Sequence, residues 1–172
     1  MPPLAVTRTY LEMRSAGELA PAREPGPGAR VERLGACPPS FFRYLYTEVG
    51  RDYHWTDRLR WTDDEIAAYL ADGSVTVHVL YVEHAPAGYY ELRRHDEGSV
   101  EIAYFGLLPE YTGRGLGGWL LTRAVGDAWG RGATRVWLHT CTLDHASALP
   151  NYRKRGFVPY HTETYQVEAG SD

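Results

Sequence analysis

The sequence predicts a mixed α/β fold with a mainly antiparallel central sheet flanked by helices. Strand-like segments follow one another across short turns in the middle of the chain, which is typical of an antiparallel meander. A strand–helix–strand unit comes after them, and further helix signals lie on both sides. With 172 residues, of which 44% are hydrophobic and 23% charged, we expect one domain, residues 1–172, with a core of its own.

The first half of the chain carries start signals for two helices. Ser40 follows two prolines and is expected to be the N-cap of an aromatic helix over residues 41–49. Thr62 and Glu65 have the spacing of a capping box, which predicts a second helix that ends at Gly73. A polar and aromatic stretch without clear periodicity separates the two helices and predicts a loop.

Alternation and β-branched residues predict the strands, and residues 75–82 are the clearest case. The expected strands are 7–13, 75–82, 88–94, 99–108, 135–142 and a final strand or strand pair over 157–167. We expect a long helix from about Leu116 to Trp129 and a short one within 144–155. Pro150 removes a helix N–H, so the short helix should start late or be kinked.

Composition narrows the classes of function. The formal net charge is -4, whereas nucleic-acid binders usually carry a basic surface. The two cysteines, Cys37 and Cys141, cannot form a disulfide framework, and their spacing matches no metal site; Cys141 is expected to be a packed thiol. Charged residues among the first twenty predict no secretory signal, and no apolar run reaches the roughly 20 residues of a membrane helix. We therefore expect a cytoplasmic protein without nucleic-acid, membrane or metal partners.

Residues 109–121, PEYTGRGLGGWLL, are the most informative stretch. A strand-like run leads into a glycine-rich turn, and a helix opens at about Leu116. Glycines let the backbone bend tightly and approach a ligand, and a helix N-terminus offers free N–H groups and a positive dipole end. Arg114 adds a positive charge. The pattern is typical of a pyrophosphate site, although a plain connecting loop would read in the same way.

A second motif, ALPNYRKRGFVPY, follows in residues 148–160. Together the two motifs resemble the GNAT superfamily of acyl-CoA-dependent N-acetyltransferases. The phosphate loop of that family reads Gln/Arg-x-x-Gly-x-Gly/Ala, and its glycines fall on Gly115 and Gly117. Its first position falls on Thr112, which is neither Gln nor Arg. The family's later tyrosine, followed after three residues by Gly-Phe, is matched by Tyr152.

The resemblance implies a GNAT-like fold and acetyl-CoA as cosubstrate. In the family, backbone N–H groups just before the loop hold the thioester carbonyl and the pantetheine arm, and Gly106 should let the ligand approach closely. His145 stands where many members have an asparagine that contacts the arm. The residues expected to bind the cosubstrate are Phe105, Gly106, Leu107, Gly113, Arg114, Gly115, Leu116, Gly117, Gly118 and His145.

Acyl transfer to an amine needs a group that takes the amine proton and a group that serves the leaving thiolate. By its motif position Tyr152 is expected to protonate the thiolate, because a phenol is protonated at pH 7; the alternative is a tyrosine packed in the core. Glu101 lies fourteen positions before Gly115, and this offset resembles that of family members with a catalytic glutamate on the strand before the loop. The resemblance makes Glu101 the first candidate for the base; the alternative is a solvated strand carboxylate. Strand alternation puts Glu101 on the same face as Phe105 unless a bulge intervenes.

Three further side chains could take the amine proton. His145 and Asp144 are rivals of Glu101, and so is His139, although its strand pattern is more typical of a core histidine. The expected catalytic residues are therefore Tyr152 and Glu101, with His145 as the main rival base.

The resemblance places the acceptor under the N-terminal half of the chain. Its aromatic residues, with Glu48 and Asp52, would suit an amine that has an apolar body, although core packing would also explain them. Those aromatic residues are Phe41, Phe42, Tyr44, Tyr46, Tyr53, Trp55 and Trp61.

No cysteine is placed to carry an acyl group, which favours direct attack in a ternary complex. The predicted function is acetyl transfer from acetyl-CoA to a primary amine, in a small molecule or a peptide. The alternatives are O-acyl or other acyl-CoA chemistry on the same fold, and a non-enzymatic acyl-CoA sensor. A homodimer is left open.

Overall fold

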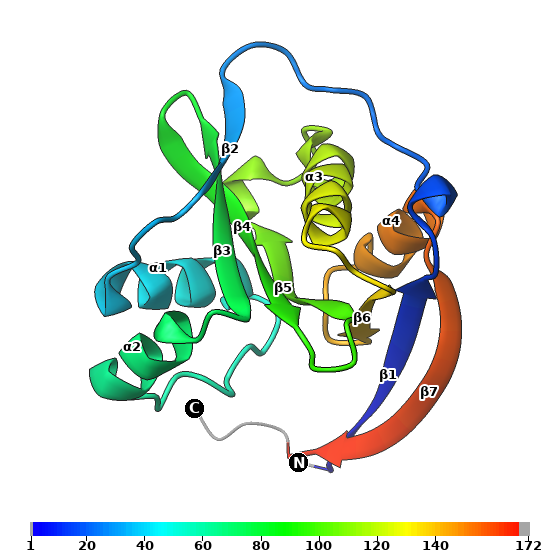
Figure 1. Ribbon diagram of the computed structural model, residues 1–172. Helices are drawn as coiled ribbons and strands as arrows, with labels where there is room; N and C mark the ends of the chain where they lie inside the picture. Colours follow the sequence, from blue (N-terminus) through cyan, green and yellow to red (C-terminus); the bar gives the residue numbers. More distant parts are fainter. Residues whose placement is uncertain (1, 169–172) are drawn as a thin grey trace.

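The computed structural model describes residues 2–168, which form seven strands and four α-helices (Figure 1). The strands are β1 (Leu4–Met13), β2 (Ala29–Arg33), β3 (Val75–Val82), β4 (Ala85–Arg94), β5 (Val100–Leu107), β6 (Val136–Cys141) and β7 (Val158–Val167). The helices are α1 (Pro39–Gly50), α2 (Asp63–Ala71), α3 (Leu116–Gly130) and α4 (Ala148–Arg155).

All strands belong to one sheet with the order β2-β3-β4-β5-β6-β1-β7. Every neighbouring pair is antiparallel except β5 and β6, which are parallel. This parallel contact has only two residue pairs, Val100 with Val136 and Glu101 with Trp137. Beyond them β5 and β6 diverge, so the sheet opens between a β2–β5 half and a β6–β1–β7 half (Figure 1). The predicted mixed, mainly antiparallel fold is confirmed.

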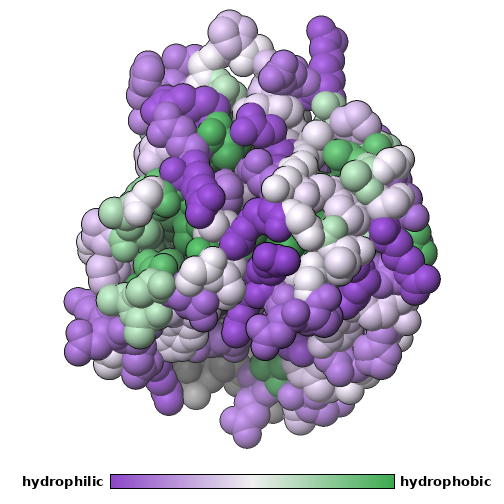
Figure 2. Space-filling view, in the orientation of Figure 1, coloured by the Kyte–Doolittle hydropathy of each residue, from purple (hydrophilic) through white to green (hydrophobic). Residues whose placement is uncertain are grey.

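The helices cover the two faces of the sheet. Helices α1 and α2 lie on one face, and α3 and α4 lie on the other (Figure 1). Tyr89 and Tyr90 are consecutive on β4, and each is buried in a different apolar cluster. The larger cluster lies under α3, and the smaller one lies under α1. On the face shown in Figure 2 the surface is mainly hydrophilic, with separate small hydrophobic patches.

A β-bulge in β5 changes which side chains face the same way. Glu91 on β4 pairs with Tyr104, whereas Leu92 pairs with Ile102, so Ala103 is an extra residue. As a result Ile102 and Phe105 both pack toward the α3 cluster, and Tyr104 packs toward the other one. The intervening bulge thus breaks the simple alternation that would have put Glu101 and Phe105 on one face.

The expected starts of two elements are wrong, and one strand is missing from the prediction. Ser40 lies inside α1, which begins at Pro39 with Pro38 as N-cap, because the fixed φ of proline suits the first helical position. The turn before β4 is at Glu83 and His84, both with positive φ, so this strand begins before residue 88. Strand β2 was not predicted at all, since its five residues follow a Pro/Gly-rich stretch.

The other predicted elements are found close to their expected positions. The Thr62 hydroxyl accepts the Glu65 N–H at 3.2 Å and caps α2, although this helix ends at Ala71 and not at Gly73. Helix α4 begins late, at Ala148, and holds Pro150 in its first turn, where a helix needs no N–H donor. The final segment is one strand. Within residues 2–168 no helix is long and apolar enough to cross a membrane.

Candidate active site

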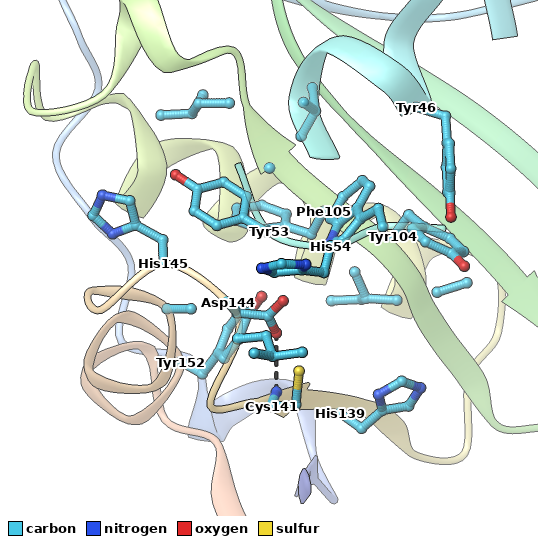
Figure 3. Close-up of a pocket in the computed structure, with 18 of the residues that line it drawn as sticks. Tyr46, Tyr53, His54, Tyr104, Phe105, His139, Cys141, Asp144, His145 and Tyr152 are labelled. Carbon is cyan, nitrogen blue, oxygen red and sulfur yellow. Dashed lines mark hydrogen bonds between the residues drawn. The ribbon is translucent and has the colours of Figure 1, made fainter. Parts of the chain in front are cut away.

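A cavity of about 1340 Å³ opens where β5 and β6 diverge. The glycine turn and the start of α4 border one end, and the α1–α2 loop lies across the cavity, with Tyr53 beside His145 and Trp55 beside Tyr104 of β5. Figure 3 shows Tyr53 and His145 together at one side of this space, with Tyr46 and Tyr104 at the opposite side. One continuous space therefore joins the expected phosphate site to the expected acceptor side.

The glycine turn has the backbone that phosphate binding requires. Gly113 and Gly115 have φ angles of 73° and 76°, which favour glycine, and nothing lies within 4 Å of where their Cβ atoms would be. Gly115 is the N-cap of α3, so the free N–H groups and the positive dipole end of this helix face the turn. These features fit a pyrophosphate group.

The remaining predicted residues of the turn divide into two groups. Gly117 and Gly118 line the cavity with Gly113 and Gly115, whereas Arg114 and Leu116 are absent from its walls. The Arg114 guanidinium lies 5.2 Å over the ring of Tyr111. Leu116 is buried in the α3 cluster.

The second half of β5 offers a free strand edge to the cavity. Phe105, Gly106 and Leu107 line it and lie beyond the two residue pairs that join β5 to β6. Packing gives a second reason for glycine at position 106, because a Cβ there would lie 2.5 Å from Cγ1 of Val49. Gly106 thus makes room for α1 to pack on β5, and the close approach of a ligand to this residue stays a prediction.

Tyr152 of α4 lies at the wall of the cavity and is almost fully buried. Its ring meets that of Phe105 edge-on at 6.0 Å. Burial, and to a lesser degree the charge of Asp144, raises the pKa of Tyr152 above its ordinary value. The phenol therefore keeps its proton at neutral pH.

Glu101 also lines the cavity, on the side away from the glycine turn. Its side chain is 14% exposed, and Oε1 lies 3.0 Å from Nε2 of His95. The bulge at Ala103 separates Glu101 from the edge residues. A proton taken up by Glu101 thus has an imidazole next to it.

His145 and Asp144 lie on the loop between β6 and α4. The Nδ1 atom of His145 accepts the Ser147 N–H at 3.0 Å, so the neutral ring carries its proton on Nε2. The ring meets Tyr53 edge-on at 5.9 Å. Asp144 accepts from the Thr140 hydroxyl at 2.6 Å and from the Cys141 N–H at 3.0 Å, which gives it a role in shaping this loop (Figure 3).

His139 was expected in the core, but it lines the cavity and is exposed to solvent. Dense surroundings and the charge of Arg8 lower its pKa. Cys141 also lines the cavity and is half-buried, with a thiol pKa raised by burial. Strand alternation could have predicted this position. Val136 and Leu138 are on the buried side of β6, and because side chains alternate along a strand, His139 lies on the other side.

The α1–α2 loop covers the side of the cavity where the acceptor is expected. Of the aromatic residues expected there, Tyr46, Tyr53 and Trp55 line the cavity. Glu48 instead pairs with Arg51 at 3.1 Å, and neither Glu48 nor Asp52 is among the lining residues. The carboxylate that the loop contributes is Asp57.

Arg58 ties this loop to the sheet, a role that the sequence did not reveal. Its two terminal nitrogens donate to the two carboxylate oxygens of Glu91 at 2.7 and 2.9 Å. Four aromatic rings surround the guanidinium, with centroids 4.1 to 5.5 Å from Cζ. They belong to Phe42, Trp61, Tyr69 and Tyr104.

A glycine turn at a helix N-terminus, next to a free strand edge in an open sheet, is the arrangement that the sequence resemblance predicts for a GNAT-like fold. A model of the Acetyltransferase (GNAT) family matches residues 41–157, and the chain belongs to this family. The family implies an acyl-CoA donor.

Curated relatives agree with the family. Uncharacterized N-acetyltransferases of Mycobacterium tuberculosis and Mycobacterium bovis are 32% identical over 103 residues, which is 60% of this chain. The match spans 65% of the length of these relatives.

Solved structures share the fold. A GCN5-related N-acetyltransferase from Sphaerobacter thermophilus has a TM-score of 0.70 at 18% identity, over 99% of this chain and 54% of that one. One from Kribbella flavida has a TM-score of 0.68 at 19% identity, over 95% and 59%. A metagenomic aminoglycoside acetyltransferase in complex with sisomicin has a TM-score of 0.64 at 16% identity, over 74% and 87%.

Proposed function

We propose that this GNAT-family protein transfers an acetyl group from acetyl-CoA to a primary amine, by direct attack in a ternary complex. One observation carries the proposal. A single cavity joins the glycine turn, the free edge of β5, the phenol of Tyr152 and the carboxylate of Glu101. Donor and acceptor can therefore meet without an intermediate carrier.

The turn and the strand edge hold the donor. Backbone N–H groups from Gly113 to Gly118 and the dipole of α3 bind the pyrophosphate. The arm lies along Phe105 to Leu107, where backbone N–H groups of β5 can also hold the thioester carbonyl as its oxygen gains charge. The proton on Nε2 of His145 is available to the arm as a further hydrogen bond.

The transfer itself uses one acid and one base. The amine nitrogen bonds to the thioester carbonyl carbon, and the carbon–sulfur bond then breaks. Tyr152 gives its proton to the departing thiolate, which its raised pKa supports because the phenol stays protonated. Glu101 takes the proton that the amine loses, directly or through water, with His95 beside it.

Two other side chains compete with Glu101 for the role of base. The lowered pKa of His139 keeps its ring neutral at pH 7, which is the form that accepts a proton. His145 is tied to Ser147 through Nδ1, and a neutral ring in this state has no free lone pair on Nε2. Glu101 therefore remains the first choice and His139 becomes the stronger imidazole rival.

The solved structure of the metagenomic aminoglycoside acetyltransferase shows that this fold can serve an enzyme that acts on an aminoglycoside. Its identity of 16% supports the shared fold and not a shared substrate. Two alternatives remain, O-acyl transfer and acyl-CoA binding without transfer. Tyr152 and Glu101 favour an enzyme, because a sensor needs neither group.

Product analysis separates the three cases. The purified protein is incubated with acetyl-CoA and a library of primary amines, with the corresponding alcohols as a matched set. Mass spectrometry should show acetylated amines, and free CoA should appear in equal amount. Acetylated alcohols alone would identify O-acyl transfer. Tight binding of acetyl-CoA without any acetylated product would identify a sensor.

A further inference from the structure

We propose that the acceptor amine also carries a carboxylate, and that Arg60 and Arg93 bind it. The acceptor would then be an amino acid or a similar compound in which a carboxylate lies a few bonds from the reacting nitrogen. This inference rests on the proposed function.

The arginines that line the cavity differ in whether they already have a carboxylate partner. Arg8 and Arg58 also line it, but each has a carboxylate partner. Arg8 pairs with Glu163 at 3.1 Å, and Arg58 pairs with Glu91. Arg60 and Arg93 are exposed lining residues, and neither has an ion pair or a side-chain hydrogen bond with any residue from 2 to 168. Two guanidinium groups at the acceptor side are thus free to bind an anion.

Arg93 is free although it has a carboxylate directly opposite. Glu101 is its partner in the β4–β5 ladder, yet Glu101 bonds His95 at 3.0 Å. Directly opposite residues on neighbouring strands have Cβ atoms about 5 Å apart. An ammonium group near Glu101 and an anion near Arg93 would therefore belong to one small zwitterion.

Arg60 reaches the same cavity from a different element. It lies on the α1–α2 loop two residues after Arg58, whose bonds to Glu91 fix the loop on the sheet. Arg60 is thus held near a fixed point of the wall, while Arg93 extends from β4. A carboxylate can accept paired N–H donors from a guanidinium group, which makes arginine its preferred partner.

The charge balance favours a carboxylate over a phosphate. Asp57, Glu101, Asp144 and Glu168 also line the cavity, so Arg60, Arg93 and the third lining cation without an ion pair among residues 2–168, Lys154 of α4, are offset by negative charge nearby. Such a mixed site suits a ligand with one positive and one negative charge. A doubly charged phosphate would meet repulsion from these carboxylates.

Matched pairs of acceptors test the inference. Tyrosine is compared with tyramine, β-alanine with ethylamine, and β-alanine with the phosphonate aminoethylphosphonate. We expect kcat/KM to be about 10- to 100-fold higher for the carboxylate in each pair, which is the range of a hydrogen bond to a charged group. Arg93→Gln and Arg60→Gln should each remove most of that preference and leave the rates with the plain amines within a few fold.

Arg94→Gln is the control, since Arg94 is the next residue on β4, is exposed and does not line the cavity. It should keep the full preference. Plain amines that react as well as their carboxylate partners would overturn the inference and leave the proposed function intact. So would a Gln variant that slows all acceptors equally, or a preference for the phosphonate.

If no amine is acetylated, the proposed function fails. The anion site at Arg60 and Arg93 is then tested by measuring how tightly the same compounds bind. Calorimetry of the same pairs is then carried out with the CoA-bound protein. At least tenfold tighter binding of the carboxylate member, lost in Arg93→Gln, would support the anion site. Equal binding of both members would overturn it.

Discussion

The guanidinium of Arg58 and the carboxylate of Glu91 form a two-bond ion pair inside the protein. The two N–H···O contacts measure 2.7 and 2.9 Å, and the side chains are 9% and 0% exposed. The Tyr69 hydroxyl donates to the same carboxylate. This buried pair is therefore one of the contacts that hold the α1–α2 loop in place, together with the Arg43 hydrogen bond to the Trp61 carbonyl at 2.6 Å.

Removing one partner of this pair should be costly. Arg58→Met leaves the charge of Glu91 buried without its partner, and the free energy of unfolding should fall by about 3–5 kcal/mol in urea denaturation. The double change Arg58→Met and Glu91→Met should recover much of this loss. Arg30→Met breaks the exposed pair with Glu32 and should cost less than about 1 kcal/mol. Equal losses in Arg58→Met and Arg30→Met would contradict the role of the buried pair.

Gly117→Val tests the phosphate site. A Cβ at Gly117 meets only Asn151 and Leu107, at 3.7 and 3.9 Å, so the variant should fold. Its branched side chain would enter the cavity at the turn, and calorimetry should show CoA binding weakened by at least about tenfold. Gly126→Val is the control on the same helix, where nothing lies within 4 Å. Unchanged CoA affinity in folded Gly117→Val would place the pyrophosphate elsewhere.

Tyr152→Phe should lower kcat by about 10²–10⁴-fold and leave the Kd for acetyl-CoA within a few fold. In the proposed mechanism the phenol acts when the thiolate leaves, so its loss should affect turnover and not binding. Tyr160→Phe, an exposed tyrosine outside the cavity, should behave like the original protein. Single-turnover kinetics make the measurement, and an unchanged chemical step would remove Tyr152 from the mechanism.

Glu101→Gln keeps the shape of the side chain and removes its basicity. The rate should fall about 10²-fold or more near pH 7 and partly recover at high pH, where the amine loses its proton unaided. His139→Gln and His145→Ala test the rival bases in the same pH–rate profiles. The base would be one of the histidines if Glu101→Gln had the pH–rate profile of the original protein. The histidine in question would be the one whose variant no longer shows the fall in rate at low pH.

His78 should make the protein less stable in acid. Burial lowers its pKa from 6.5 to about 4. The unfolded chain therefore takes up a proton below pH 6.5 that the folded protein does not accept until about pH 4. Stability is full above pH 6.5 and falls as the pH drops toward 4, by up to about 3 kcal/mol. Urea denaturation at several pH values should show a shallower fall for His78→Gln. Parallel curves for the two proteins would contradict this linkage.

Local patterns in the sequence predicted the elements that rest on local chemistry. Thr62 with Glu65, and the glycines before α3, act through neighbouring residues, so their spacing was enough. Contacts between distant residues could not be predicted in this way. The packing reason for Gly106 lies in Val49, and the role of Arg58 depends on Glu91. The face of Glu101 depends on the bulge at Ala103, which appears only in the pairing with β4.

The short contact between β5 and β6 also affects how easily the two halves of the sheet separate. Hydrogen bonding across the sheet is nearly interrupted there, so the two halves can move apart more easily than the strands within either half. A donor that binds in this gap stabilises the folded protein against opening. Resistance to proteolysis should therefore rise with the concentration of acyl-CoA, and the protein would be degraded most readily when the donor is scarce.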